Sequence, residues 1–270
     1  MNSEELYRQI KRKKSFLCVG LDSDPALFPQ LLRHVQYPIF EFNKAIIAAT
    51  AKYAVAYKPN LAFYEAEGNQ GLHQLEMTVD FLRKNYPDIF IIADAKRSDI
   101  GNTAKRYARA FFEKMNFDAV TIAPYMGYDS VGPFLEYKGK WSVILALTSN
   151  KSAADFELSN MQTGEPLYKR VITEAMKWGD KDNIMFVVGA TRPEKLAQIR
   201  EYCPDNFFLV PGVGAQGGSV DEVAKYGLNS KCGLLVNSSR GIIFADNSER
   251  YAVTAGEKAA ELASQMARYL

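Results

Sequence analysis

Short apolar runs bounded by turn residues recur eight times along this 270-residue chain and alternate with longer amphipathic stretches. The runs are rich in β-branched residues and apolar at successive positions, which is typical of parallel strands covered by helices. Eight such alternations indicate a (β/α)₈ barrel, and no composition shift or linker divides residues 1–270 into two domains. The predicted strands are residues 16–21, 54–57, 89–93, 119–123, 142–147, 184–188, 207–210 and 233–236.

The amphipathic stretches between these runs predict the helices that cover the barrel. The clearest of them are residues 72–86, 103–115, 167–178 and 193–202, with a terminal helix at 252–270. In a barrel of this kind, reactive groups come from the C-terminal ends of the strands. The polar connection at residues 149–165 is long for a barrel loop, and we interpret it as a lid over that end.

Charge and cysteine content exclude several classes of protein. The 33 Lys and Arg residues nearly balance 31 Asp and Glu residues and are interspersed with them, which gives no basic surface for nucleic acid or membrane. No signal-peptide pattern is present, and no apolar stretch approaches the ~20 residues that cross a bilayer. Cys18, Cys203 and Cys232 are widely separated, as expected of free thiols in a reducing cytoplasm. We therefore expect a cytoplasmic protein.

Charged side chains follow the third apolar run directly. Asp94 and Lys96 lie two residues apart, so they share a face of the predicted strand, and Asp99 follows beyond its end. Charged groups at the end of a core strand are costly to desolvate, and apolar residues would serve packing better. This segment therefore indicates chemistry rather than structure.

Other predicted strands also end in polar residues. Asp22 follows the first strand, although a turn residue in Asp-Ser-Asp-Pro is an equally good interpretation of it. Lys58 follows the second strand and precedes Pro59, which holds it extended. Alone it would be a surface lysine, but opposite Asp94 and Lys96 it becomes a candidate site residue.

A glycine-rich segment follows the seventh strand. Gly212-x-Gly214-x-x-Gly217 matches the dinucleotide-binding fingerprint, but no acidic residue follows ~20 positions later to hold a ribose. Barrels commonly bind phosphate with the loops after strands 7 and 8, where Gln216 and Arg240 could donate. The alternative is an ordinary glycine turn with Arg240 in a surface ion pair. We favour phosphate binding.

Several other kinds of site lack support in the sequence. His34 and His73 lie away from the strand ends, and no serine or cysteine arrangement accompanies them, so a hydrolase triad is not indicated. Asp94 with Asp99 could hold Mg²⁺, but Lys96 between them would compete with the metal. The pattern favours a metal-free site.

Taken in order, these residues resemble the orotidine 5′-phosphate decarboxylase family over about residues 16–247. The resemblance lies in Asp22, Lys58, Asp94-x-Lys96-x-x-Asp99 with Thr103, the Pro-Gly-Val-Gly-Ala-Gln segment ending at Gln216, and Arg240. The longer insertions and Asn-Ser-Ser-Arg240 resemble its longer bacterial subfamily. Ser98 stands where that subfamily usually has glycine, which should stiffen the turn before Asp99.

The resemblance implies a homodimer whose active sites straddle the interface. Asp99 and Thr103 would reach the neighbouring subunit's site and contact the ribose there. Within one chain, the resemblance implies roles for further residues. These are Asp22 and Lys58 at the ribose hydroxyls, Ser149 at the pyrimidine edge with Thr148 as the alternative, and Gln216, Arg240 and Gly241 at the 5′-phosphate. No cofactor or metal is implied.

The implied reaction is the decarboxylation of orotidine 5′-monophosphate to uridine 5′-monophosphate in pyrimidine biosynthesis. Loss of CO₂ leaves an anion at C6 without a conventional electron sink, so a fixed cation is the available remedy. Lys96, flanked by Asp94 and Asp99, would stabilise and protonate that carbon. The alternatives are a Mg²⁺-dependent keto-sugar-phosphate lyase or decarboxylase of related barrels, and a catalytically silent nucleotide-binding barrel.

Overall fold

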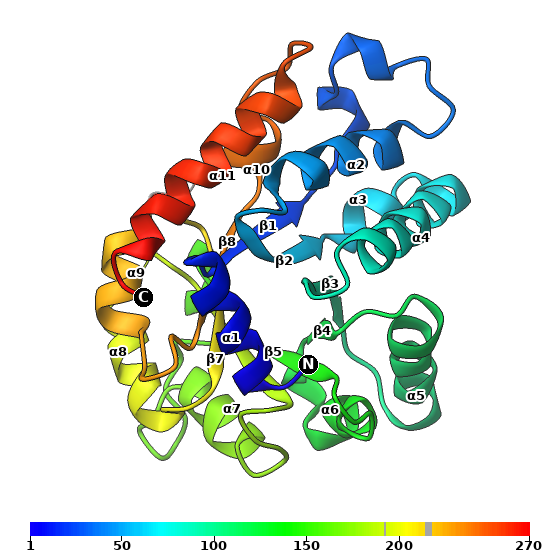
Figure 1. The fold of residues 1–270 in the computed structure, drawn as a ribbon. Helices are drawn as coiled ribbons and strands as arrows, with labels where there is room; N and C mark the ends of the chain where they lie inside the picture. The colour runs from blue at the N-terminus through cyan, green and yellow to red at the C-terminus, as the bar shows by residue number, and fades with distance from the viewer. Residues whose placement is uncertain (192, 214–217) are drawn as a thin grey trace.

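Eight parallel strands close into a barrel in the computed structural model of the chain (Figure 1). Each strand pairs with the next along the sequence, and β8 pairs with β1 to complete the ring. The structure describes residues 1–191, 193–213 and 218–270. The strands are β1 Leu17–Leu21, β2 Ala54–Pro59, β3 Phe90–Arg97, β4 Ala119–Ile122, β5 Trp141–Leu147, β6 Ile184–Val188, β7 Phe207–Pro211 and β8 Leu234–Ser238.

Helices surround the barrel in Figure 1, and α1 lies across one of its ends. The α-helices are α1 Ser3–Lys13, α2 Pro38–Thr50, α3 Leu61–Glu65, α4 Gly68–Asn85, α5 Gly101–Arg109, α6 Tyr128–Leu135, α7 Leu167–Ala175, α8 Pro193–Tyr202, α9 Val220–Gly227, α10 Arg240–Ile243 and α11 Tyr251–Ala267. Short 3₁₀-helices are η1 Pro25–Leu27, η2 Gln30–Leu32, η4 Pro124–Met126 and η5 Lys151–Ala154, and η3 Ala110–Lys114 is a π-helical segment. None of the helices in the described ranges has the length and apolarity needed to span a membrane.

The barrel predicted from the eight apolar runs is confirmed, and each run forms a strand. The predicted ends are wrong where polar residues continue a strand. β3 runs on to Arg97 because Arg97 still pairs with Ile122, and β2 and β8 likewise extend to Pro59 and Ser238. The predicted helix at 103–115 divides into α5 and the wider turn η3. In these strands the first polar residue marks where the apolar run ends, but strand pairing continues beyond it.

The register between β3 and β4 contains a bulge that matters for the site. Ala93 pairs with Val120 and Arg97 pairs with Ile122, so four steps along β3 correspond to two along β4. Two extra residues therefore lie in β3 at the position of Asp94 and Lys96. Bulges of this kind redirect side chains and recur next to active sites.

Aromatic side chains fill the barrel on the side where the strands begin. The ring of Trp141 packs edge-on against Phe90, with centroids 5.9 Å apart, and against Phe207 at 6.2 Å. Its indole N–H donates to the backbone oxygen of Met1 at 2.7 Å. All three rings are buried, so this part of the barrel is packed solid and the chemistry must lie at the opposite end.

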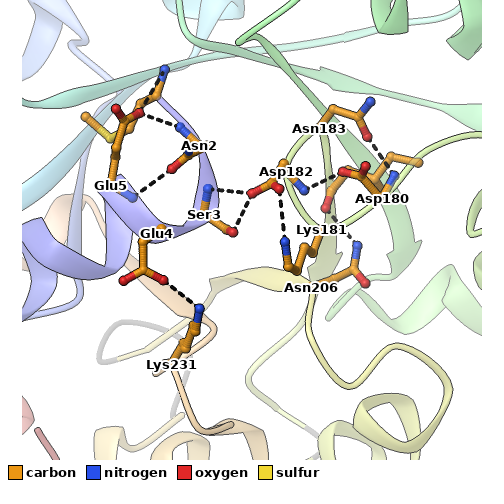
Figure 2. Close-up of polar contacts among 12 residues, drawn as sticks. Asn2, Ser3, Glu4, Glu5, Asp180, Lys181, Asp182, Asn183, Asn206 and Lys231 are labelled. Carbon is orange, nitrogen blue, oxygen red and sulfur yellow. Dashed lines mark hydrogen bonds and ion pairs between the residues drawn. The ribbon is translucent and has the colours of Figure 1, made fainter.

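Helix α1 closes that packed end through polar contacts (Figure 2). Asn2 and Glu5 cap the first turn reciprocally. The backbone N–H and the hydroxyl of Ser3 both donate to Asp182, in the connection between α7 and β6, while Glu4 forms an exposed ion pair with Lys231. Hydrogen bonds from Ser3, which is buried, anchor the helix more than the exposed pair does.

Replacing Asp182 with Ala is expected to lower the free energy of unfolding by about 1–2 kcal/mol, because two donors of Ser3 lose their acceptor. The matched control, Lys231→Ala, removes an exposed ion pair and should change it by less than about 0.5 kcal/mol. Urea denaturation of both variants at neutral pH measures the difference. Equal losses would show that Ser3 does not anchor α1.

Candidate active site

A cavity of about 390 Å³ lies at the C-terminal ends of the strands. It is lined by residues that follow or end β1, β2, β3, β7 and β8, namely Asp22, Lys58, Asn60, Asp94, Pro211, Gly212, Val213, Asn237, Ser239 and Arg240. A wider hollow of about 830 Å³ adjoins it at Arg240, between the loops after β1 and β8. The buried charges lie in the smaller cavity, so we place the site there.

Asp94 holds two ammonium groups at once. Its Oδ2 accepts from Lys58 Nζ at 2.6 Å, and its Oδ1 accepts from Lys96 Nζ at 2.5 Å. The side chains of Asp94 and Lys58 are only 10% and 5% exposed, whereas that of Lys96 is 51% exposed. Burial alone would raise the pKa of the Asp94 carboxyl, but Lys58 and Lys96 outweigh it and hold that pKa well below its ordinary value. Asp94 is therefore a fixed anion.

Lys58 is a buried cation whose charge is compensated from both sides. Burial alone would lower its pKa, but Asp94 and Asp22 outweigh that effect and raise it. Asp22 Oδ1 lies 3.9 Å from Lys58 Nζ and is itself buried, without a hydrogen-bond partner among the described residues. A buried carboxylate oxygen without a donor fits a ligand hydroxyl, which would supply one.

The backbone at Lys96 is strained. Its φ is +46°, in the left-handed region that residues other than glycine rarely adopt, and such a conformation costs about 1–3 kcal/mol. The strain coincides with the bulge in β3, and together they place the Lys96 ammonium beside Asp94. Strain of this kind persists only where the surroundings fix it, and it concentrates at functional sites.

The structure brings Asp22, Lys58, Asp94 and Arg240 to one cavity, with Lys96 paired to Asp94. Asp99 and Thr103 do not line this cavity: Asp99 precedes α5, and Thr103 lies in the first turn of that helix. The Asp99 carboxylate accepts from the backbone N–H of Ile100 at 2.8 Å, and Thr103 is exposed. Among the described residues of one chain, Lys96 thus pairs with Asp94 and not with Asp99.

The connection after β5 contains both candidates for the pyrimidine contact. Thr148 donates its backbone N–H and its hydroxyl to Glu157, so its side chain is already engaged. Ser149 packs against Gly189, the residue that follows β6. A Cβ added to Gly189 would lie only 2.8 Å from the backbone nitrogen and the Cβ of Ser149. Gly189 therefore sets where Ser149 lies.

Two further predictions concern loops. Gly241 is exposed in α10, directly after Arg240, and the predicted phosphate ligand Gln216 lies outside the described residues. Ser98 is not among the described residues with positive φ, whereas Gly101 has a φ of +55°. The serine that replaces the expected glycine therefore adopts an ordinary conformation, and the left-handed position in this turn belongs to Gly101.

Three residues that line the cavity escaped prediction. Asn60 follows β2 and caps α3, Asn237 is the penultimate residue of β8 and has a buried Oδ1 without a partner among the described residues, and Ser239 follows that strand. Their signal was position after a strand, but asparagine and serine are equally common in helix caps and turns. A Cβ on Gly20 would lie 1.9 Å from Ser239 Oγ, so glycine in β1 makes room for this loop.

The donor set describes what the cavity can hold. Both carboxylate oxygens of Asp94 accept from ammonium groups, which leaves them poor ligands for a cation. Within the described ranges, no three His, Cys, Asp or Glu side chains converge. The three cysteines, Cys18, Cys203 and Cys232, are buried free thiols, and burial raises the pKa of each to about 12. The charged and polar groups that line the cavity suit a ligand that carries hydroxyls and negative charge.

Fold and site together define a (β/α)₈ barrel with a charged mouth, the class in which active sites lie at the C-terminal ends of the strands. The model of the orotidine 5′-phosphate decarboxylase / HUMPS family matches residues 15–255, and the chain belongs to this family.

Curated relatives and solved structures agree with this assignment. The chain is 55% identical over 270 residues to the orotidine 5′-phosphate decarboxylase of Phocaeicola vulgatus, covering 100% of this chain and 99% of that protein. It is 56% identical to that of Bacteroides fragilis, covering 100% and 98%. A putative orotidine-monophosphate decarboxylase from Toxoplasma gondii has a TM-score of 0.84 at 34% identity, covering 98% of each chain. The Leishmania donovani OMP decarboxylase has a TM-score of 0.81 at 35% identity, covering 98% of this chain and 100% of that one.

Replacing Asp94 with Asn should lower the free energy of unfolding by about 3 kcal/mol at neutral pH, because it leaves buried Lys58 with Asp22 alone at 3.9 Å. The pKa of Asp94 is depressed in the folded chain, so its stabilisation is present above the ordinary value of 3.8 and declines as pH falls below it. The difference from the parent should therefore shrink below about pH 4. The control Asp99→Asn should cost about 0.5 kcal/mol or less. Urea denaturation across pH checks both, and equal losses would contradict the role of Asp94.

Proposed function

We propose that the chain decarboxylates orotidine 5′-monophosphate to uridine 5′-monophosphate in de novo pyrimidine biosynthesis, as a carbon–carbon lyase without a cofactor. The observation that carries the proposal is the Lys58–Asp94–Lys96 cluster at the mouth of the barrel, in which Lys58 and Asp94 are buried and Lys96 is half exposed. Family membership supports it, as do relatives about 55% identical over the full chain that bear this activity in their names. A Mg²⁺-dependent keto-sugar-phosphate enzyme is not favoured, because ammonium groups occupy both oxygens of Asp94.

The substrate would lie across the cavity with its phosphate toward β7 and β8, and residues 1–270 would act as one domain. Asp22 Oδ1 and Lys58 would bind the ribose hydroxyls, since the first lacks a donor and the second provides one. Arg240, Gly241 and Gln216 would bind the phosphate, where barrels of this kind commonly bind one.

Ser149 would contact the pyrimidine edge. Thr148 is the alternative, and its hydroxyl donates to Glu157. Glu157 belongs to the connection after β5, so the same bond ties the proposed lid to the strand that carries it.

Lys96 would stabilise the carbanion that remains at C6 after CO₂ leaves. A unit charge pair ~4 Å apart at an effective dielectric of about 20 interacts by ~4 kcal/mol. Enzymes typically lower their barriers by ~8–23 kcal/mol, so one ammonium supplies only part of the effect. The rest would come from groups fixed in advance in a site that excludes water, closed with free energy from phosphate binding. Lys96 would then transfer its proton to C6.

Asp94 would lie beside the carboxylate that leaves. It remains ionised because Lys58 and Lys96 hold its pKa low, so two negative groups would face each other in the bound ground state. Loss of CO₂ removes one of these charges, and the attraction between Lys96 and the new carbanion grows in the same step. The arrangement would thus favour the transition state over the bound substrate.

A homodimer would complete the site. Apolar side chains are exposed around the ends of β3, β4 and β5, where a monomer has no reason to expose them together. They are Ile100, Tyr125, Met126, Tyr128 and Phe156, and Tyr125 is 85% exposed. Asp99 and Thr103 flank Ile100, so pairing through this surface would bring them toward the partner's cavity.

The protein would act in the cytoplasm. Its three cysteines are buried free thiols, which fits a reducing compartment.

The wild-type chain should consume orotidine 5′-monophosphate with loss of its ultraviolet absorbance, at a rate unchanged by EDTA. Lys96→Ala should lower kcat by at least about 10⁴-fold, because both the cation and the proton donor at C6 are lost. Binding of uridine 5′-monophosphate, measured by calorimetry, should remain detectable. An inactive wild type, or activity abolished by EDTA, would reject the proposed reaction, and near-normal turnover by Lys96→Ala would remove Lys96 from it.

Mixing Asp99→Ala and Lys96→Ala dimers should restore activity if Asp99 acts across the interface. Each parent dimer is expected to be nearly inactive, whereas a hybrid dimer holds one site with both residues intact. Random exchange would give up to about a quarter of wild-type activity per site. Native mass spectrometry confirms subunit exchange, and exchange without recovery of activity would place Asp99 in its own chain's site.

A further inference from the structure

Thr121 is the β4 residue that faces the bulge in β3. It lies between Val120 and Ile122, which pair with Ala93 and Arg97 on either side of the two extra residues. Its side chain is only 1% exposed. Since β3 bulges here, Thr121 is opposite the stretch in which Asp94 and Lys96 leave the regular ladder.

The hydroxyl of Thr121 joins the two catalytic candidates. It accepts a hydrogen bond from the backbone N–H of Lys96 at 2.9 Å and donates to Asp94 Oδ1 at 3.1 Å. The backbone oxygen of Ala93 lies farther away, at 3.5 Å. Asp94 Oδ1 is the same atom that accepts from Lys96 Nζ, so Thr121 contacts the backbone of Lys96 and also the carboxylate that holds its ammonium.

A side-chain hydroxyl is needed here because the bulge interrupts the backbone pairing. Regular ladder bonds resume just beyond it, where Ala123 N–H donates to the Arg97 oxygen at 3.0 Å. Within the bulge, the N–H of Lys96 finds its acceptor in the side chain of β4. Buried backbone donors are almost always paired, so removing this acceptor would release the segment whose φ is positive at Lys96.

We propose that Thr121 is a positioning residue for the reaction proposed above, on which this inference rests. Through the two hydrogen bonds of one hydroxyl, it fixes both the left-handed backbone of Lys96 and the orientation of the Asp94 carboxylate. It acts through these two residues and does not touch the substrate. Valine has nearly the same shape and serves a strand equally well, so the role belongs to the hydroxyl and not to packing.

The experiment compares Thr121→Val, which removes the hydroxyl, with Thr121→Ser, which keeps it. With orotidine 5′-monophosphate, Thr121→Val should lower kcat roughly 10- to 100-fold while KM changes less than about threefold, in line with loss of a hydrogen bond to a charged group. Thr121→Ser should stay within about threefold of wild type. The matched control is Thr50→Val, a buried threonine of α2 whose hydroxyl contacts Ile46 and Tyr57, and its kcat should be unchanged.

A second measurement does not depend on activity. Hydrogen exchange at the backbone amide of Lys96 should be at least about tenfold faster in Thr121→Val than in wild type or Thr121→Ser. Wild-type kcat for Thr121→Val, or an equal loss in Thr121→Ser, would overturn the positioning role. If Thr121→Val does not fold, Thr121→Ser alone decides, since a drop of more than tenfold contradicts the proposal. An inactive wild type with the expected exchange pattern would reject the reaction but leave the link between Thr121 and Lys96 standing.

Discussion

The site depends on one buried carboxylate that holds two ammonium groups. Asp94 and Lys58 come from adjacent strands, and neither could be buried alone without a large desolvation cost. Their pairing lets a charged cluster exist inside the mouth of the barrel and fixes Lys96 beside it before any substrate binds. Reorganisation that would otherwise accompany the reaction is thereby completed during folding, which is the condition for strong electrostatic catalysis.

The two ends of the barrel serve opposite needs. At the closed end, Trp141 and the helix anchored by Asp182 satisfy their polar groups within the chain. At the open end, Lys96 is strained, and Asp22 and Asn237 each keep a buried oxygen without a partner among the described residues. Such groups lower stability in the free chain. Packing at the closed end offsets that loss of stability. A ligand with hydroxyl groups would donate hydrogen bonds to the buried oxygens at the open end.

The barrel could be predicted because buried parallel strands leave continuous apolar runs. The position of Asp94 and Lys58 at the mouth of the barrel could be predicted because charged residues interrupt such runs. The bulge in β3 could not, since it is defined by pairing with β4. Thr121 was hidden for the same reason, because threonine in a strand is ordinary and its role appears only opposite the bulge. Asn60 and Asn237 could not be told from ordinary helix-capping or turn residues. The need for glycine at position 20 could not be predicted either, because it arises from the close approach of Ser239 in the folded chain.

The proposed dimer would couple association to catalysis. Among the described residues of one chain, Lys96 has a single carboxylate partner and remains half exposed to water, where an ammonium is strongly screened. Asp99 lies in a segment flanked by exposed apolar side chains, so the surface that would bury them is also the one that would move Asp99 toward a second site. Burying that surface would exclude water from Lys96 and strengthen its interaction with a carbanion. The proposed dimer would thus supply both the missing carboxylate and the low dielectric that makes the ammonium effective.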